Sequence, residues 1–174
     1  MKLADIDART LARDTLQEAL AQVDRILFGI APFSSYVVTD TDGKPLRADN
    51  VEGSVAGDAV LALVRYAQTG AGMDAPVSEY GISLIPVAPD ALDESCEPDP
   101  KTPLGLVVTA ALARERIGEG GSVTTSQLAH LASVTPGYIR QLVAKGELEA
   151  EDNEIGASAA KRFLSARGVA GFNR

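Results

Sequence analysis

The sequence predicts an α+β protein, in which a mixed N-terminal region of helices and strands is followed by a C-terminal group of short helices. Two patterns lead to this prediction. Strand-like runs alternate with amphipathic helical stripes over residues 1–100. From residue 122 onward, residues that favour helix N-caps recur at short intervals, which predicts several short helices. With 174 residues, of which 45% are hydrophobic and 23% charged, the chain can bury a core, so disorder throughout is excluded.

The first helix is predicted over residues 7–29. Apolar residues recur there at alternating spacings of four and three, and Gly29 and Pro32 end the pattern. The stripe consists of Leu16, Leu20, Val23, Leu27 and Ile30. Such a stripe either covers the core of its own domain or pairs with the same helix of a second subunit.

A β-hairpin is predicted next, over residues 33–47, because Tyr36 to Val38 favour a strand and Asp42-Gly43 is a preferred tight-turn pair. The same Asp-rich stretch can be aligned with a calcium-binding loop. In that alignment Val38 would occupy the first ligand position and Pro45 would lie inside the loop. The sequence therefore favours a plain turn and predicts no metal site.

A second helix is predicted from a cap at Asp49 or Asn50 to Gln68, and residues 81–87 have the pattern of a strand bounded by prolines. Residues 88–102 are acidic and rich in proline, which is typical of an exposed loop or hinge.

A third helix is predicted to begin at the cap and first-turn pair Thr102-Pro103 and to run to Ile117. Its apolar side would be formed by Leu104, Val107, Val108, Ala111 and Leu112. The glycine-rich residues 118–121 follow. No strand precedes them and no Gly-Lys-Ser/Thr follows them, so they are interpreted as a joint and not as a phosphate loop.

The charge is distributed unevenly. The net charge is −8, but residues 1–121 carry 10 basic and 19 acidic side chains, whereas residues 122–174 carry 6 basic and 5 acidic ones. We therefore divide the chain into an α+β dimerisation or partner-binding domain at 1–100, a connecting helix and joint at 101–121, and a C-terminal domain at 122–174. An acidic chain argues against non-specific polyanion binding, but it allows a local cationic face.

Several classes of function are disfavoured. Cys96 and His130 are the only cysteine and the only histidine, so an internal disulfide, a Cys/His zinc site and most catalytic triads lack their residues. We expect no cofactor and no enzymatic activity. Asp5 and Asp7 stand where a signal segment would be apolar, and the longest apolar stretch is too short to span a bilayer. We expect a cytoplasmic protein without a membrane partner.

The C-terminal residues predict a helix, a turn and a second helix. Thr125 is expected to cap a helix at 126–132, and Thr135, with Pro136 after it, to cap a helix that ends near Lys145. Residues 147–155 are long enough for a short two-stranded wing, and Ser158 can cap a last helix at 159–167.

The second of these helices would bury Ile139, Leu142 and Val143. Its outward surface would then carry Tyr138, Arg140, Gln141 and Lys145. A helix fits the DNA major groove, and arginine and glutamine side chains suit bidentate contacts to base edges.

The order of these signals over about 50 residues resembles the winged helix-turn-helix of the excisionase and mercury-regulator (MerR) type. The matching elements are Thr124-Thr125, Leu128 to Leu131, Val134-Thr135-Pro136, Ile139-Arg140, Gly146-Glu147-Leu148 and Phe163-Leu164. The resemblance implies that Thr125 and Thr135 meet phosphates and that Tyr138, Arg140 and Gln141 meet the groove. It also implies a partner, double-stranded DNA, and an output, the regulation of transcription.

The wing departs from that family, where it is commonly basic. Here it carries five carboxylates, Glu147, Glu149, Glu151, Asp152 and Glu154, which repel a polyanion. Either the wing points away from DNA, or binding requires a dimer, or the module has become a protein-binding domain. A homodimer would place two reading helices about one DNA turn, ~34 Å, apart. The alternative function is an acidic interaction module of the antitoxin-like, anti-restriction or DNA-mimicking kind.

Overall fold

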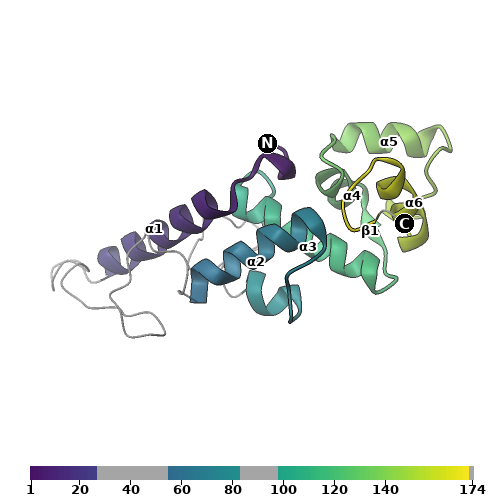
Figure 1. Ribbon diagram of the computed structural model, residues 1–174. Coiled ribbons are helices and arrows are strands. Elements are labelled where there is room, and N and C mark those ends of the chain that lie inside the picture. Colours follow the sequence, from purple (N-terminus) through teal and green to yellow (C-terminus); the bar gives the residue numbers. More distant parts are fainter. Residues whose placement is uncertain (27–54, 83–97, 173–174) are drawn as a thin grey trace.

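The computed structural model describes residues 1–26, 55–82 and 98–172. The predicted hairpin at 33–47, the predicted start of the second helix at 49–54 and Cys96 lie outside these residues. The described part is mainly helical, with one small antiparallel sheet of two strands (Figure 1). No helix in this part is long and apolar enough to cross a membrane.

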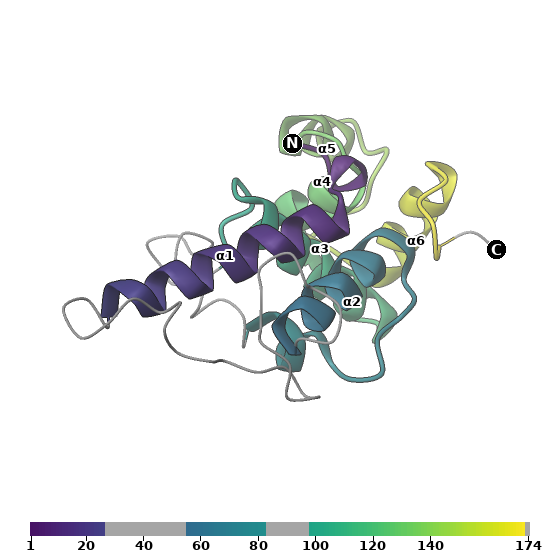
Figure 2. The same ribbon diagram turned by 60° about the vertical axis from the view of Figure 1, so that its left-hand side comes forward.

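Helices α1 (Ala8–Ile26) and α2 (Val55–Thr69) lie side by side in two views of the molecule (Figures 1 and 2). Asp7 directly precedes α1, and its Oδ1 accepts a hydrogen bond from the Thr10 N–H in the first turn at 2.8 Å. The prediction of a helix is confirmed over the residues that α1 covers. The buried side chains of α2 include Val60, Leu63, Val64 and Ala67, as its periodicity predicts.

The predicted strand at 81–87 is wrong at its start, since Gly81 and Ile82 belong to the π-helical turn η3 (Ser78–Ile82). The rest of that prediction lies outside the described residues. Just before the turn, Val77 is fully buried and donates its backbone N–H to Glu115 Oε1 at 2.8 Å. This contact joins residues 38 positions apart, and a local strand pattern carries no information about it.

Helix α3 (Pro103–Gly118) occupies the middle of the fold and packs against α2 on one side and against the C-terminal helices on another (Figure 1). Thr102 caps it as predicted, and its Oγ1 accepts a hydrogen bond from the Gly105 N–H at 3.1 Å. The prediction that α3 buries only one side is wrong. Leu106, Ala110, Ala113, Arg114 and Ile117 are buried as well, because neighbours cover several sides of this helix.

Helices α4 (Thr125–Leu131), α5 (Pro136–Ala144) and α6 (Ala157–Ala166) follow. Two predicted caps are shifted. Thr124, not Thr125, caps α4, since its Oγ1 accepts from the Gln127 N–H at 3.2 Å and its own N–H donates to Gln127 Oε1 at 3.0 Å. Gly156, not Ser158, occupies the cap position of α6, which begins earlier than predicted. Thr135 caps α5 as predicted.

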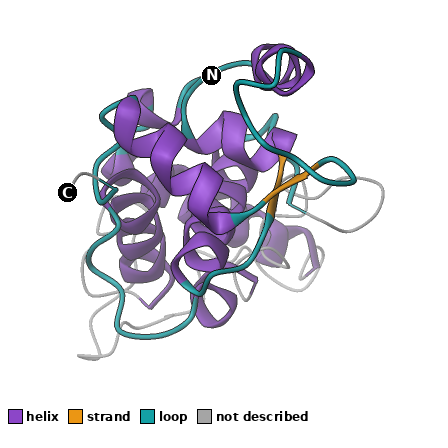
Figure 3. Cartoon of the chain, turned by 90° about the vertical axis from the view of Figure 1, so that its right-hand side faces the viewer, coloured by secondary structure: helices purple, strands orange, loops and turns teal. Residues whose placement is uncertain are grey.

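The strand pairing also differs from the predicted wing. Strand β1 (Val123–Thr124) precedes α4 and pairs with β2 (Glu154–Ile155), so that Val123 lies opposite Ile155 (Figure 3). Within residues 147–155 itself, the pairing is limited to a bridge between Glu151 and Glu154. Asp152 and Asn153 form the tip of this turn with positive φ angles of 48° and 66°. The sheet therefore ties the turn to the chain before α4.

Apart from Leu106, the buried apolar side chains of the described residues form one cluster, which extends from Leu3 to Leu164 and includes residues of all six α-helices described. Helix α3 supplies the largest share of this cluster and links its two ends. The proposed division at residues 100 and 121 stays a prediction.

A buried cation joins three segments of the fold. Arg114 on α3 is only 4% exposed, and its guanidinium donates to the carbonyls of Ala67 at 3.2 Å and Ala170 at 2.9 Å. A longer contact of 3.5 Å reaches the carbonyl of Gln68, and the ring of Phe172 lies 4.6 Å from the guanidinium carbon. Arg114, which lies on α3, thereby connects α3 with the end of α2 and with the segment after α6.

We predict that Arg114→Met lowers the free energy of unfolding by about 2–4 kcal/mol. The substitution keeps most of the aliphatic stem but leaves backbone carbonyls without their donors. Chemical denaturation of both proteins measures the difference. Arg116→Met is the matched control, since Arg116 lies two residues further along α3 and is exposed, and it should change stability by less than about 0.5 kcal/mol. Equal effects of the two substitutions would contradict this role of Arg114.

Candidate nucleic-acid interface

The candidate site is the outward surface of α5 together with the elements that hold it. Helix α4 packs against α5, and the turn between them includes Ser133 with a positive φ of 54°. The Val134 N–H donates to the Ala129 carbonyl at 2.9 Å, which closes the end of α4. Ile139 is fully buried on the inner side of α5. The orientation of α5 is therefore fixed by its apolar side.

The predicted site residues of α5 are exposed. Tyr138, Arg140, Gln141 and Lys145 all have exposed side chains, and Tyr138 is one of the exposed large hydrophobic residues of the described chain, at 39%. Thr135 is exposed too and caps the helix, where its Oγ1 accepts from the Tyr138 N–H at 3.2 Å. The structure thus brings five of the six predicted residues together on one helix and its two ends.

Helical spacing divides these residues between two edges of the outward surface. Tyr138, Gln141 and Lys145 follow each other at intervals of three and four residues, so they form one row. Arg140 forms the other edge. The small residues Gly137 and Ala144 lie between the two edges. A surface with small residues in its middle and long polar ones at its borders can approach a groove closely.

Thr125 is placed differently from the other predicted residues. Its side chain is 4% exposed, and its hydroxyl donates to Asn153 Oδ1 at 3.2 Å. The side chain therefore fixes the turn at 151–154 against the first turn of α4. We leave Thr125 out of the proposed contact set for this reason. The sequence pattern placed it at a cap, where its hydroxyl would have been exposed, but the true cap is its neighbour Thr124.

Arg167 also lies on this surface, although no pattern in the sequence predicts it. It follows α6 and is exposed, and its guanidinium carbon lies 5.5 Å from the ring centre of Tyr138 and 5.6 Å from that of Phe163. It adds a cation near the N-terminal end of α5, beside Tyr138. No local signal indicates this contact, because Arg167 and Tyr138 are 29 positions apart and meet only through tertiary packing.

Two of the five acidic residues between 147 and 155 have side-chain partners. Glu149 forms an ion pair with Arg162 of α6 at 3.3 Å, and Glu154 accepts a hydrogen bond from the hydroxyl of Ser122. Glu147, Glu151 and Asp152 are exposed. The ion pair is itself exposed, so it changes the local field more than it changes stability.

His130 is half-buried on α4, and its Nε2 lies 3.3 Å from Ser126 Oγ. Burial lowers the pKa of His130 below the usual range, which favours the neutral ring at neutral pH. This pair is a local contact across one helical turn. Among the described residues, no group of three or more His, Cys, Asp or Glu side chains is arranged to hold a metal ion.

Comparison with models of protein families, with curated proteins and with solved structures found no match to this chain.

The contact between Arg167 and Tyr138 yields a prediction about stability. In a double-mutant cycle, Arg167→Gln and Tyr138→Leu should be coupled by about 0.5–1 kcal/mol, the range of exposed cation–π pairs. The cycle is measured by chemical denaturation of the four proteins. A second cycle that pairs Arg162→Gln with Tyr138→Leu serves as the control, because Arg162 contacts Glu149 instead. Coupling no larger than in the control cycle would show that the contact is absent in solution.

Proposed function

We propose that this protein is a sequence-specific, DNA-binding regulator of transcription that acts as a homodimer. In this proposal residues 122–174 form a winged helix-turn-helix of the excisionase and MerR type, with α5 as the reading helix. The observation that carries the proposal is the outward surface of α5, which exposes Tyr138, Arg140, Gln141 and Lys145 while Ile139 is fully buried.

The chemistry of this surface supports the proposal. Arginine and glutamine offer paired hydrogen-bonding groups to the edges of guanine and adenine, and Lys145 at the end of α5 can neutralise a phosphate. Arg167 beside Tyr138 adds a cation at the other end. None of these side chains belongs to the core, because the apolar contacts of α5 are made by Ile139, Leu142 and Val143.

The acidic turn sets a limit on affinity. Glu147, Glu151 and Asp152 are exposed, so a phosphate backbone close to them would be repelled. The ion pair of Glu149 with Arg162 offsets one of the negative charges of this turn. A single reading helix of this kind contacts few bases, so we assign dimerisation or partner binding to the acidic N-terminal region. Two copies would then read half-sites ~34 Å apart.

We predict distinct effects for substitutions on α5. After selection of a preferred site from random duplexes, Arg140→Ala should weaken binding to that site by about 1–3 kcal/mol and binding to random DNA much less. Gln141→Ala should act in the same direction but more mildly. Lys145→Ala should weaken all sequences about equally and lower the salt dependence by about one unit, because a phosphate contact carries no base preference.

Quantitative gel shifts at two salt concentrations measure these effects. Arg116→Ala is the control for loss of a positive charge, since Arg116 is exposed on α3 outside the proposed surface. The selected site should be an inverted repeat if the protein binds as a homodimer. Failure to select any site, together with purification of a tight complex with a basic protein, would favour the alternative, an acidic interaction module. Its support is the net charge of −9 over residues 1–121.

A further inference from the structure

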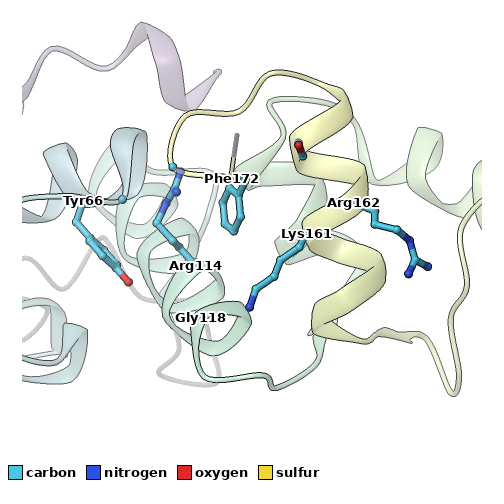
Figure 4. A pocket seen from close by; sticks show the side chains of 9 residues that line it. Tyr66, Arg114, Gly118, Lys161, Arg162 and Phe172 are labelled. Carbon is cyan, nitrogen blue, oxygen red and sulfur yellow. The ribbon is translucent and has the colours of Figure 1, made fainter. Parts of the chain in front are cut away.

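A cavity of about 630 Å³ opens between the end of α2, helix α3, helix α6 and the segment that follows α6 (Figure 4). This volume is typical of sites for small organic molecules. The cavity is lined by two aromatic residues, Tyr66 and Phe172, by the cations Arg114, Lys161 and Arg162, and by Ser165 and three glycines. It is distinct from the outward surface of α5, none of whose residues lines it.

The charge of this lining is positive, although the chain as a whole is acidic. None of the described residues that line the cavity is a carboxylate. Figure 4 shows the side chain of Lys161 extending toward Gly118 at the end of α3, whereas the side chain of Arg162 extends in the opposite direction. Arg162 is paired with Glu149 at 3.3 Å. Lys161 and Arg114 therefore dominate the electrostatic potential inside the cavity.

Two nearby carboxylates lie toward Tyr66. Glu115 and Glu119 both raise the pKa of the Tyr66 hydroxyl, after the larger effect of burial, so they contribute some negative potential on that side. Glu115 Oε1 accepts the Val77 N–H and is held by that bond. Neither residue lines the cavity. An anion would accordingly bind nearer to Lys161 than to Tyr66.

Arg114 lacks an anionic partner among the described residues. Its hydrogen bonds go to neutral backbone carbonyls, and its buried Nε–H has no acceptor. Burial lowers the pKa of Arg114 to about 10, so the guanidinium is still charged at neutral pH. A buried cation without a counter-ion is unfavourable, and a bound anion in the adjacent cavity would offset that cost.

We propose that this cavity binds a small organic carboxylate. The ammonium of Lys161 donates to the carboxylate, the charge of Arg114 stabilises it from the cavity wall, and the apolar part of the ligand contacts the rings of Phe172 and Tyr66. A singly charged group fits better than a dianion. The cavity offers one accessible cation, and Gly118 at the end of α3 places negative carbonyl dipoles close by.

The proposal is tested by titrating the full-length protein with benzoate at constant ionic strength, with calorimetry as the readout. Benzamide, which has the same shape without the charge, and inorganic phosphate are the comparison probes. Benzoate should bind saturably with a stoichiometry of one, and both comparison probes should bind at least about tenfold more weakly. Benzamide binding as tightly as benzoate would overturn the role of the carboxylate. Tighter binding of phosphate would overturn the choice of an organic monoanion.

A matched pair of variants locates the site. Lys161→Gln should weaken benzoate binding about tenfold, because it removes the accessible cation. Arg162→Gln removes the same charge from the next residue of the same helix, and it should change the affinity by less than about twofold, since its side chain is directed away. Both residues are exposed, so neither variant should unfold the protein. Equal losses in the two variants, or no saturable benzoate binding to the parent protein, would overturn the proposal.

Discussion

The buried guanidinium of Arg114 is the interaction on which the arrangement of the described helices depends. Its donors reach the carbonyls at the end of α2 and the carbonyl of Ala170 in the segment after α6, and Phe172 covers it. Cations are favourable near the end of a helix, where carbonyl groups lack intrahelical partners. One side chain of α3 thus connects the end of α2 with the segment that follows α6.

Two glycines make room for this arrangement. At Gly70, with φ of +78°, an added Cβ would come within 2.8 Å of Arg114 Nη1. At Gly171, with φ of +81°, it would come within 2.5 Å of the Thr69 carbonyl oxygen and 2.7 Å of the same Nη1. Both positions combine a positive φ with a close contact, so any larger residue would displace the guanidinium. The same close approach of α2, α3 and the final segment creates the cationic cavity beside Arg114.

Local signals in the sequence predicted much of the helical structure. The apolar spacing of α2, the Thr102-Pro103 start of α3 and the Thr135 cap of α5 each depend on residues within a few positions of one another. The exposure of Arg140 and Gln141 follows in the same way from the burial of Ile139. Expectations failed where distant residues decide the structure. Residues 81 and 82 belong to η3, which follows the contact of Val77 with Glu115, β1 pairs across α4 and α5 with β2, and Thr125 is buried against Asn153.

The roles of single cations required the tertiary structure. In the sequence, Arg114, Lys161 and Arg167 are ordinary helical residues, and nothing local distinguishes them from Arg116 or Arg162. Packing places Arg114 in the core, Lys161 at a cavity and Arg167 on Tyr138. Burial changes the energetic role of Arg114, whereas Lys161 and Arg167 are exposed and differ from their neighbours in the groups that surround them.

The central claim is that α5 presents its outward surface to DNA, and backbone-amide NMR tests it most directly. The full-length protein would be titrated with a duplex of mixed sequence at low salt, where even non-specific contacts to phosphates are strong. We predict chemical-shift changes concentrated between Thr135 and Lys145 and around Arg167, with little change in α1 and α2. Shifts confined to other elements, or no shifts at a large excess of duplex, would contradict it.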